Sequence, residues 1–457
     1  MAILNQTLLA TALPHIMDSL QLTANTVQWL TTAFMLVNGI MIPISAFLID
    51  RFTTRQMFIT AMGIFALGTL ICGVSSTYAL LLFGRVVQAA GAGMIMPLMQ
   101  TVLFVMYPPN QRGAAMGIFG LVIAFAPAIG PTLSGWLIEH FDWRILFFII
   151  LPIAVADLVL AFFLLKNVTE RTFPKLDLLS IILSTLGFGG LLYGFSSAGS
   201  SGWASMQVVG TILIGAISLV FFIWRQFKLD QPMLEFRVFK YDVFTLTTII
   251  GMVVFMAMIG AATILPIYMQ TMHHFTAMES GLMLLPGAII MGLMSPVTGR
   301  IFDRFGAKWL AIIGLSIITI TTFMLTHLTA TTSFSFLTVV YAIRMFGISM
   351  VMMPVTTAGL NQLPSKLIPH GTAMSNTLRQ VMGSIGTALL VTIMTSHTLN
   401  VPNEAVSINM INGVNRAFLT ATFITTVGLV LSFFIRPKGR EGSDSGQRIG
   451  GRKKAFT

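Results

Sequence analysis

Charged side chains are scarce in this sequence. Asp, Glu, Lys and Arg make up 9% of its 457 residues, whereas hydrophobic residues make up 55%. Soluble globular domains carry about 25% charged residues, so this chain has too little charge to cover a water-exposed surface. Its mean hydropathy of +0.87 agrees with that deficit. The composition excludes a soluble globular protein and predicts an integral membrane protein with many spanning segments.

Sites that depend on cysteine, clustered histidine or a phosphate loop are also missing. The single cysteine, Cys72, excludes an intramolecular disulfide and a cysteine metal cluster, and the seven histidines show no metal-ligand spacing. The sequence has no Gly-x-x-x-x-Gly-Lys-Ser/Thr pattern, which argues against direct driving by ATP. No set of nucleophile and base stands in the apolar runs, so an enzyme is the least favoured reading.

What the chain does contain is apolar runs of membrane-spanning length, for which about 20 residues suffice. They are continuously apolar rather than alternating, which favours helices over a β-barrel. Met1 begins directly in the first run and the first basic residue is Arg51, so we interpret this run as a membrane helix and not as a signal peptide. The fourteen candidate spans lie at about 1–16, 27–49, 57–76, 79–105, 113–137, 145–165, 178–197, 206–224, 243–269, 279–298, 309–328, 334–358, 371–395 and 415–435.

Basic residues are distributed unevenly between alternate loops. With fourteen crossings, 21 of the 26 Lys and Arg residues lie in one set of loops and the C-terminal segment, and the opposite loops hold Arg144 and Arg416. The remaining three, Arg85, Arg344 and Arg379, lie inside spans. Because basic loops stay in the cytoplasm, this bias predicts that both termini are cytoplasmic. It also explains the net charge of +11 by topology and contact with anionic lipid, so we expect no nucleic-acid partner.

A short charged loop occurs twice in the chain. Asp-Arg-Phe stands at 50–52 and again at 303–305, each time between two apolar runs and followed by a cation. Prolines and glycines recur at offsets of 252 to 258 residues, as in Pro14 with Pro266, Pro43 with Pro296, Pro97 with Pro354, Gly113 with Gly371 and Gly130 with Gly386. A pattern written twice at one offset indicates a duplicated unit.

The duplication predicts an all-α membrane fold of 14 transmembrane helices, built from two parallel six-helix repeats and two inserted helices. We place the N-terminal six-helix bundle at 1–165, and the two inserted helices with their cytoplasmic linkers at 166–240. The C-terminal bundle is expected at 241–436 and a basic, disordered cytoplasmic tail at 437–457.

These motifs together resemble the major facilitator superfamily. The resemblance rests on the Asp-Arg-Phe loops, on Arg85 with Gln88, and on the proline-glycine run of the fifth span. The plan of six, two and six helices is similar to the fourteen-helix drug:proton antiporter branch, and within it to lincomycin and multidrug exporters of Gram-positive bacteria. Further matches are Ile3-Leu4-Asn5-Gln6-Thr7, Ala12-Leu13-Pro14, Trp143-Arg144 and Pro174-Lys175-Leu176-Asp177.

The resemblance implies that the charged loops form a gate. In the family, the loop aspartate binds cations and a helix N-terminus of the other half, which holds the cytoplasmic side closed; a carboxylate suits both kinds of partner. The alternative is that these charges only set the topology. The first copy departs from the family pattern, with Ala46 and Thr53 at positions that the second copy keeps as Gly299 and Gly306. The expected gating residues are Asp50, Arg51, Arg55, Arg112, Asp303, Arg304 and Lys308.

Three residues are candidates for a proton relay. Arg85 lies mid-span, where a charge costs roughly 3 kcal/mol or more; the resemblance implies a relay role, and a buried hydrogen-bond hub is the alternative. Asp157 also lies mid-span, where burial would let its carboxyl exchange a proton near neutral pH, unless it only bonds a neighbouring helix. Glu279 is either a helix N-terminal acid or an outward proton port. Many relatives carry an aspartate in the first span, where this chain has Asn5, which cannot carry a proton.

Glycine and proline crowd the span at about 113–137. Small residues permit close helix contact and internal prolines bend a helix, so ordinary packing is one explanation. The run also resembles the family's antiporter motif, a kinked hinge between the halves that seals against proton leak, which favours export over uptake. The residues concerned are Gly120, Pro127, Gly130, Pro131 and Gly135.

The sequence therefore predicts an exporter that exchanges protons for drug-like amphipathic molecules by alternating access. We expect a monomer in a bacterial plasma membrane, in contact with lipid, with no metal or cofactor and driven by the proton gradient. Proton-coupled uptake of a nutrient or metabolite is one alternative, and a non-transporting membrane scaffold is another. Polar contacts to the substrate are expected from Asn5, Gln6, Asn38, Gln88, Gln100, Gln270 and Asn376.

Overall fold

The computed structural model describes residues 2–168, 171–172, 174–272, 275–396 and 406–435, and in this part of the chain helices joined by loops are present, without strands. The tail predicted to be disordered lies outside the described residues. The helices are α1 (Ala2–Ser19), α2 (Ala24–Arg51), α3 (Thr54–Gly73), α4 (Tyr78–Met106), α5 (Arg112–His140), α6 (Ile145–Leu164), α7 (Leu178–Ser201), α8 (Met206–Lys228), η1 (Phe236–Lys240), α9 (Asp242–Met272), α10 (Ala277–Phe305), α11 (Ala307–Met324), η2 (Leu325–His327), α12 (Phe334–Asn361), η3 (Ser365–Leu367), α13 (Ile368–Thr395) and α14 (Val406–Ser432).

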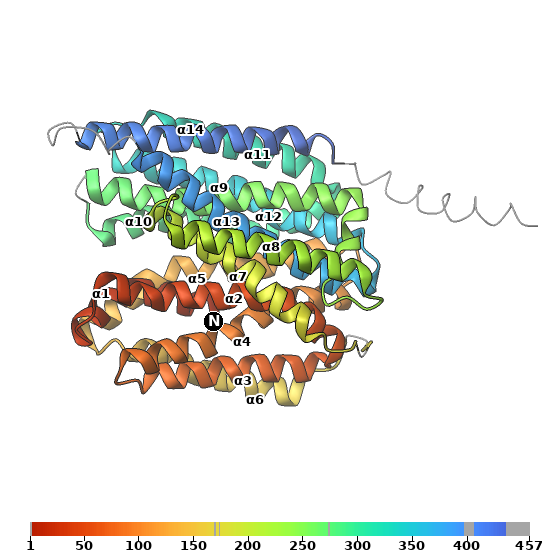
Figure 1. Cartoon of the computed structure of the whole chain (residues 1–457). Helices are drawn as coiled ribbons and strands as arrows, with labels where there is room; N and C mark the ends of the chain where they lie inside the picture. Colours follow the sequence, from red (N-terminus) through yellow and green to blue (C-terminus); the bar gives the residue numbers. More distant parts are fainter. Residues whose placement is uncertain (1, 169–170, 173, 273–274, 397–405, 436–457) are drawn as a thin grey trace, which may run out of the picture.

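Two sets of six long helices make up most of the molecule. Figure 1 shows α1–α6 as one layer and α9–α14 as another, with α7 and α8 lying along the boundary between them. Corresponding helices pack together in both sets. The pairs α3–α4, α2–α4 and α1–α5 of the first set correspond to α11–α12, α10–α12 and α9–α13 of the second. Helix prolines also recur at matching places, with Pro43 in α2 and Pro296 in α10. Helix packing thus repeats as the sequence does.

Twelve of the described helices are long and apolar enough to cross a membrane, and only α1 and α5 among the fourteen α-helices fall outside that group. The prediction of a many-helix membrane fold is therefore confirmed. The exact number of fourteen crossings and the domain boundaries at 165, 240 and 436 stay predictions.

The two copies of the charged loop turn by different means. In the first, Thr53 has an extended backbone and caps α3, because its side chain accepts from the Gln56 N–H while the Gln56 side chain accepts from the Thr53 N–H. In the second, Gly306 has a φ of 80°, a conformation that favours glycine, between α10 and α11. This explains why glycine is needed at 306 and threonine serves at 53.

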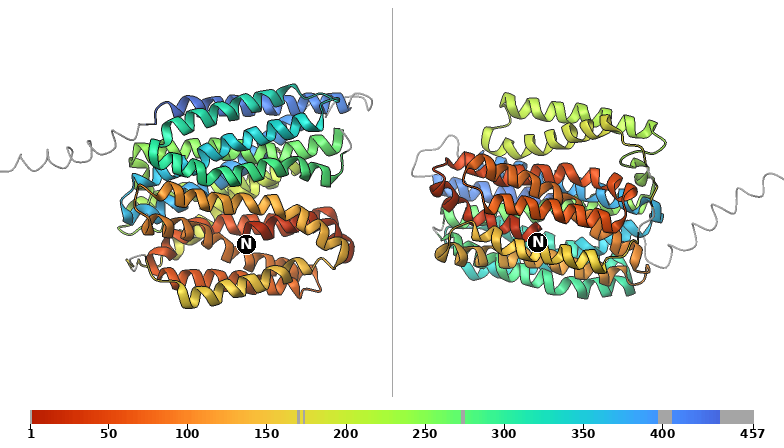
Figure 2. Two further views of the ribbon diagram at one scale, coloured as in Figure 1. Left: turned by 180° about the vertical axis from the view of Figure 1, so that it is seen from behind. Right: turned by 90° about the horizontal axis from the view of Figure 1, so that it is seen from below.

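The inserted helices α7 and α8 form a hairpin that packs through α7 onto α2 and α13, one helix from each set. Figure 2 shows the hairpin on one outer side of the bundle. At its base, Arg225 of α8 donates to both carboxylate oxygens of Asp177 at 2.7 and 2.9 Å. These hydrogen bonds lower the pKa of the Asp177 carboxyl below its ordinary value. Ser180 also donates to Asp177, so the polar groups at this end of the hairpin are paired.

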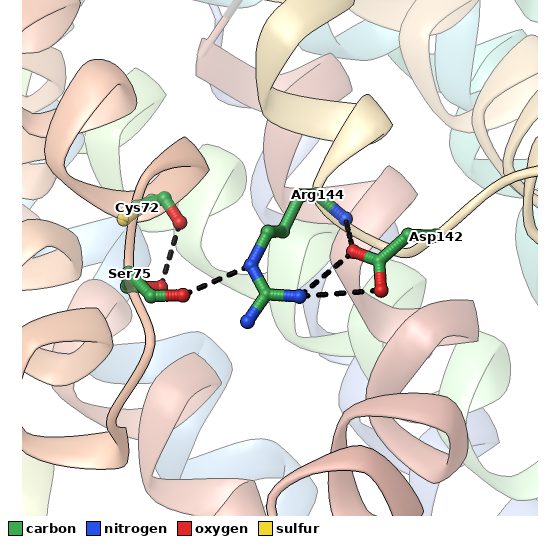
Figure 3. A network of polar contacts seen from close by, with 4 residues as sticks. All are labelled: Cys72, Ser75, Asp142 and Arg144. Atoms are coloured by element: carbon green, nitrogen blue, oxygen red, sulfur yellow. Dashed lines mark hydrogen bonds and ion pairs between the residues drawn. The ribbon is translucent and has the colours of Figure 1, made fainter.

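At the end of the bundle opposite the charged loops, a polar network joins α3 to the start of α6 (Figure 3). Arg144 donates from Nε to the Ser75 carbonyl at 2.9 Å and from Nη1 to the Asp142 carboxylate at 3.0 Å. The neighbouring Trp143 is buried, and the Arg144 guanidinium lies over its ring at 4.3 Å. The Trp143-Arg144 motif therefore anchors the α5–α6 turn on α3.

The backbones of α7 and α8 lie in close contact, which predicts that a glycine of α8 at the contact cannot be enlarged without loss of stability. A Cβ at Gly215 would lie 2.8 Å from the backbone nitrogen of Leu191, whereas a Cβ at Gly210 meets no heavy atom within 4 Å. Overpacking costs about 1–3 kcal/mol. We expect Gly215→Leu to lower the melting temperature of the purified protein in detergent by several degrees and Gly210→Leu to leave it near wild type. Equal melting temperatures for the two variants would refute the close packing of the hairpin.

Candidate functional site

Asp303, in the second charged loop, reaches across to the other helix set. Its Oδ1 accepts from the Gly113 N–H and its Oδ2 from the Ala114 N–H, both at 2.8 Å. These are the first-turn N–H groups of α5, where a helix favours negative charge. A Cβ at Gly113 would lie 2.5 Å from Asp303 Oδ1, so glycine is what lets the carboxylate approach. The contact ties the end of α10 to the start of α5.

Asp50, in the first charged loop, makes the reciprocal contact through a side chain. His370, in the first turn of α13, has its Nε2 3.1 Å from Asp50 Oδ2. The Nδ1 of His370 accepts from the Glu235 N–H at 3.3 Å, so in the neutral ring Nε2 carries the proton and donates to Asp50. His370 is buried. It thus joins the first set, the second set and the segment after the inserted hairpin.

His370 was absent from the residues predicted from the sequence. The repeat offers a signal for it, because His370 stands directly before Gly371 as Arg112 stands before Gly113. A lone histidine at a loop is common enough that this position alone does not attract attention. We name the contacts of Asp303 and Asp50 the latch. The end of the bundle where they lie is the latch end.

The predicted gating cations lie at the latch end, but their contacts differ. Arg51 donates to the Pro174 carbonyl at 3.2 Å, and Arg55 donates to the Phe162 carbonyl, both in the α6–α7 region. Arg304 lies over the ring of Phe305 at 5.3 Å, and Lys308 is half-buried at the start of α11. Arg112 does cross between the sets: its Nη1 donates to Asn361 Oδ1, at the end of α12, at 2.8 Å.

Beyond the latch, α5 and α10 run together along a seam of small residues. A Cβ at Gly299 would lie 2.8 Å from the Gly113 carbonyl carbon, and a Cβ at Gly117 would lie 2.8 Å from the Pro296 Cα. Gly120 faces Ser295 and Met353. A narrow crevice lies beside it, lined by Gly120, Ile123, Met291, Ser295, Ser349, Met352 and Met353. The two sets are thus packed backbone to backbone at the latch end.

The glycine-proline run of α5 divides between two roles. Gly120 lies on the seam between the sets, as expected for a motif at their interface. Gly130 instead faces Thr7 of α1 within the first set, and a Cβ at Gly135 would meet nothing within 4 Å. The side chains of Pro127 and Pro131 lie outside the described residues. Sealing against proton leak by this run stays a prediction.

Arg85 is the centre of a buried polar network in the first set. Its Nη1 donates to Asn5 Oδ1 at 2.5 Å and to Gln88 Oε1 at 2.6 Å, and its Nε donates to the Leu30 carbonyl at 3.3 Å. The guanidinium also lies over the Phe34 ring at 4.1 Å. The oxygen atoms that accept hydrogen bonds from the charged guanidinium are neutral. Asn5 therefore takes a position at which a carboxylate would form an ion pair with Arg85. The arrangement is the hydrogen-bond hub, and a relay role for Arg85 stays a prediction.

The two acidic relay candidates lie apart from Arg85. Glu279 caps α10, since its Oε2 accepts from the Thr276 N–H at 2.8 Å and its own N–H donates to Thr276 Oγ1. Asp157 lies on α6, a helix that packs mainly on α3, and it is partly exposed. The structure therefore supports the helix N-terminal reading of Glu279, and it does not bring Asp157 to the Arg85 network.

The polar substrate candidates separate into two buried pairs and three single residues. Asn5 and Gln88 both accept hydrogen bonds from Arg85, and Gln88 also donates to Thr69 at 2.7 Å. Asn376 of α13 donates to Gln100 Oε1 of α4 at 2.7 Å, a bond between the two sets. The others lie singly: Gln6 and Asn38 are half-buried, and Gln270 is exposed.

Comparison with known proteins agrees with this architecture. The sequence profile of the Major Facilitator Superfamily matches residues 1–387. The chain is 56% identical over 96% of its length to a protein of Bacillus subtilis named "Uncharacterized MFS-type transporter YcnB", covering 93% of it. It is 44% identical over 94% of its length to the lincomycin resistance protein LmrB of the same organism, covering 92%. The human organic anion transporter MFSD10 superposes with a TM-score of 0.69 over 94% of this chain and 96% of that one, at 13% identity, which shows a shared fold.

The latch contact of Asp303 can be tested by thiol labelling. In Asp303→Asn the amide offers one acceptor and no charge, so one N–H of α5 loses its partner at a cost of about 2 kcal/mol. We expect a Ser295→Cys probe, buried on the seam, to react several-fold faster with a small maleimide in that variant, in a Cys72→Ser background. Asp142→Asn, which breaks an ion pair at the opposite end, is the control. Unchanged labelling by Asp303→Asn would show that the latch does not hold the seam closed.

Proposed function

Because the chain belongs to the major facilitator superfamily, a family of membrane transporters, we propose that it exports drug-like amphipathic compounds in exchange for protons. The observation that carries the proposal is the latch, in which Asp303 and Asp50 each join one helix set to the other at the same end. A closure at one end of two packed sets is what alternating access requires, since substrate must reach the seam from one side at a time. The similarity to a lincomycin resistance protein supports a drug-like substrate.

The proposal includes an orientation. The latch end carries the loops that are rich in Lys and Arg, including Arg51, Arg112 and Arg304, so we place it in the cytoplasm. With α1 and α5 also crossing, the chain spans a bacterial plasma membrane fourteen times with both termini cytoplasmic. The conformation described is then closed toward the cytoplasm. Rocking of one set against the other about the seam would open it.

Proton coupling is assigned to Asp157 in this proposal. Among the described residues it is the one carboxyl away from the ends of the helices, and Glu279 is engaged as a helix cap. Asn5 cannot exchange a proton, and Arg85 is bonded to neutral oxygens. Proton binding at Asp157 would then affect Arg85 only through side-chain packing within the first set. The proposal requires no cofactor.

Two other functions remain as alternatives. Proton-coupled uptake would use the same fold and latch with the opposite net direction. A membrane scaffold fits less well, because the seam of glycines between α5 and α10 and the paired latch contacts suit two bodies that separate. Each alternative gives a different result in a transport assay.

Inverted vesicles distinguish the three functions. With an acidic interior, an exporter should take up radiolabelled lincomycin and release protons, so the quenching of an acridine dye should fall when lincomycin is added. An uptake symporter would instead lose labelled substrate together with protons, and a scaffold would change neither signal. Export would be refuted if the vesicles accumulate neither lincomycin nor other antibiotics and their pH gradient stays intact.

Replacing the assigned carboxyl tests the coupling. We expect Asp157→Asn to abolish lincomycin-dependent proton release while the variant inserts and purifies like wild type, because its amide cannot carry the proton. Glu279→Gln is the control, since the cap needs an acceptor oxygen and the amide provides one. Normal proton release in Asp157→Asn would assign coupling to another group.

A further inference from the structure

A narrow crevice lies between α2, α7 and α13, where the inserted hairpin packs on the bundle. Met35 and Leu36 of α2 and Leu192 and Tyr193 of α7 form its apolar wall. The three helices pack pairwise against one another, and Figure 1 shows α7 along the boundary between the two sets. The crevice therefore has walls from the first set, the second set and the hairpin, and it shares no helix with the α5–α10 seam.

Side chains bound the crevice at both ends. Toward the latch end, a Cβ at Gly39 would overlap Leu192 and lie 3.6 Å from Gln380 Cγ, so α2, α7 and α13 meet there. Toward the opposite end, the ring of Tyr193 stacks on the ring of Trp29, with 5.6 Å between the ring centroids. A ligand in the crevice would therefore be held between two packed contacts.

The rest of the lining is polar and uncharged. It consists of the hydroxyls of Thr32, Ser196 and Ser384 and the amide of Gln380, and none of the described residues that line the crevice carries a charge. Ser384 donates to the Gln380 carbonyl of its own helix at 3.3 Å. The side chains of Thr32, Ser196 and Gln380 form no hydrogen bond within the described chain. Met35 and Ser196 are exposed, so the crevice opens outward, toward the bilayer that surrounds the bundle.

Polar groups without partners are costly where lipid excludes water. Gln380 lies near the middle of α13, at the depth of the hydrocarbon. A hydroxyl or amide would supply hydrogen bonds to Thr32 and Gln380, and a thin apolar chain would pack on Met35 and Leu36. We propose that the crevice binds a neutral, single-chain amphiphile that enters from the bilayer, with its hydroxyl or amide head between α2 and α13. The site goes beyond the export of drug-like compounds, and its occupant contacts both helix sets.

Photolabelling of the purified full chain tests the site. The protein is reconstituted in nanodiscs of phosphatidylcholine and irradiated with increasing amounts of 3-azioctanol, and the labelled residues are mapped by mass spectrometry of its peptides. We expect labelling of Met35, Leu36 and Leu192 to saturate, as binding to a site does. The exposed outer face of α8, at Val220 and Phe221, should be labelled in proportion to the probe. A proportional rise at the crevice as well would overturn the proposal.

Variants identify the groups that hold the head of the amphiphile. Thr32→Val removes a hydroxyl and Gln380→Met removes an amide, each with little change in size. Each should raise the half-saturating probe concentration roughly fivefold, the effect of one hydrogen bond. Thr387→Val is the matched control, because this half-buried hydroxyl of α13 donates to the Gly383 carbonyl of its own helix and lies outside the lining. An unchanged concentration in both crevice variants, or an equal rise in Thr387→Val, would refute the site.

Two further arms test the charge and the shape of the ligand. The permanently charged 3-azioctyl sulfate should give no saturable labelling at the crevice, since no cation lines it in the described chain, and labelling of α8 corrects for partition into the bilayer. Saturable labelling by the sulfate would overturn the assignment to a neutral ligand. Dioleoylglycerol, which has a neutral head and two chains, should not displace 3-azioctanol; displacement would assign the crevice to a membrane lipid and overturn the single-chain ligand. Neither arm depends on transport.

Discussion

Gly113 on α5 and Gly299 on α10 lie so close together that a Cβ on either would overlap the backbone of the other helix. The latch end depends on that spacing. It brings the first-turn N–H groups of α5 within 2.8 Å of Asp303 and lets Gly117 and Gly120 continue the contact past Ser295. The closest of these contacts join backbones and small side chains, and Phe302 and Met353 are the large side chains that face Gly113 and Gly120. The two sets can therefore part along α5 and α10 with few interlocked large residues to separate.

The second latch contact shows how a duplicated unit diverges while keeping its geometry. Asp303 uses the backbone N–H groups of Gly113 and Ala114, whereas Asp50 uses the imidazole of His370, which also accepts from the Glu235 N–H. The segment after the inserted hairpin therefore contacts the latch on the Asp50 side. The hairpin itself packs on α2 and α13, so the inserted helices are tied to both sets on the side away from α5 and α10.

Sequence reasoning succeeded where the signal was periodic or repeated. Long apolar runs and the offset between Pro43 and Pro296 predict helices and a repeat, because burial and helix bending leave marks at fixed spacing. It was weaker for contacts between distant residues. Nothing local to His370 reveals Asp50 as its partner, and nothing in the glycine-proline run separates Gly120, which faces the other set, from Gly130, which faces α1. Which residue faces which neighbour depends on the rotation of each helix about its own axis. That rotation is set by the packing of a few side chains.

The three buried arginines show why the boundary between the sets matters more than burial itself. Arg85 and Arg344 each donate to a backbone carbonyl of their own set, Leu30 and Ala257, so their partners move with them when the sets rock. Arg379 bonds the Thr356 hydroxyl within its set, but its neighbour Asn376 bonds across to α4. All three arginines therefore keep these partners when the sets rock, whereas the bond between Asn376 and Gln100 must break. A polar contact across the boundary can make the two states differ in their affinity for a ligand, which is the condition for a ligand to shift their populations.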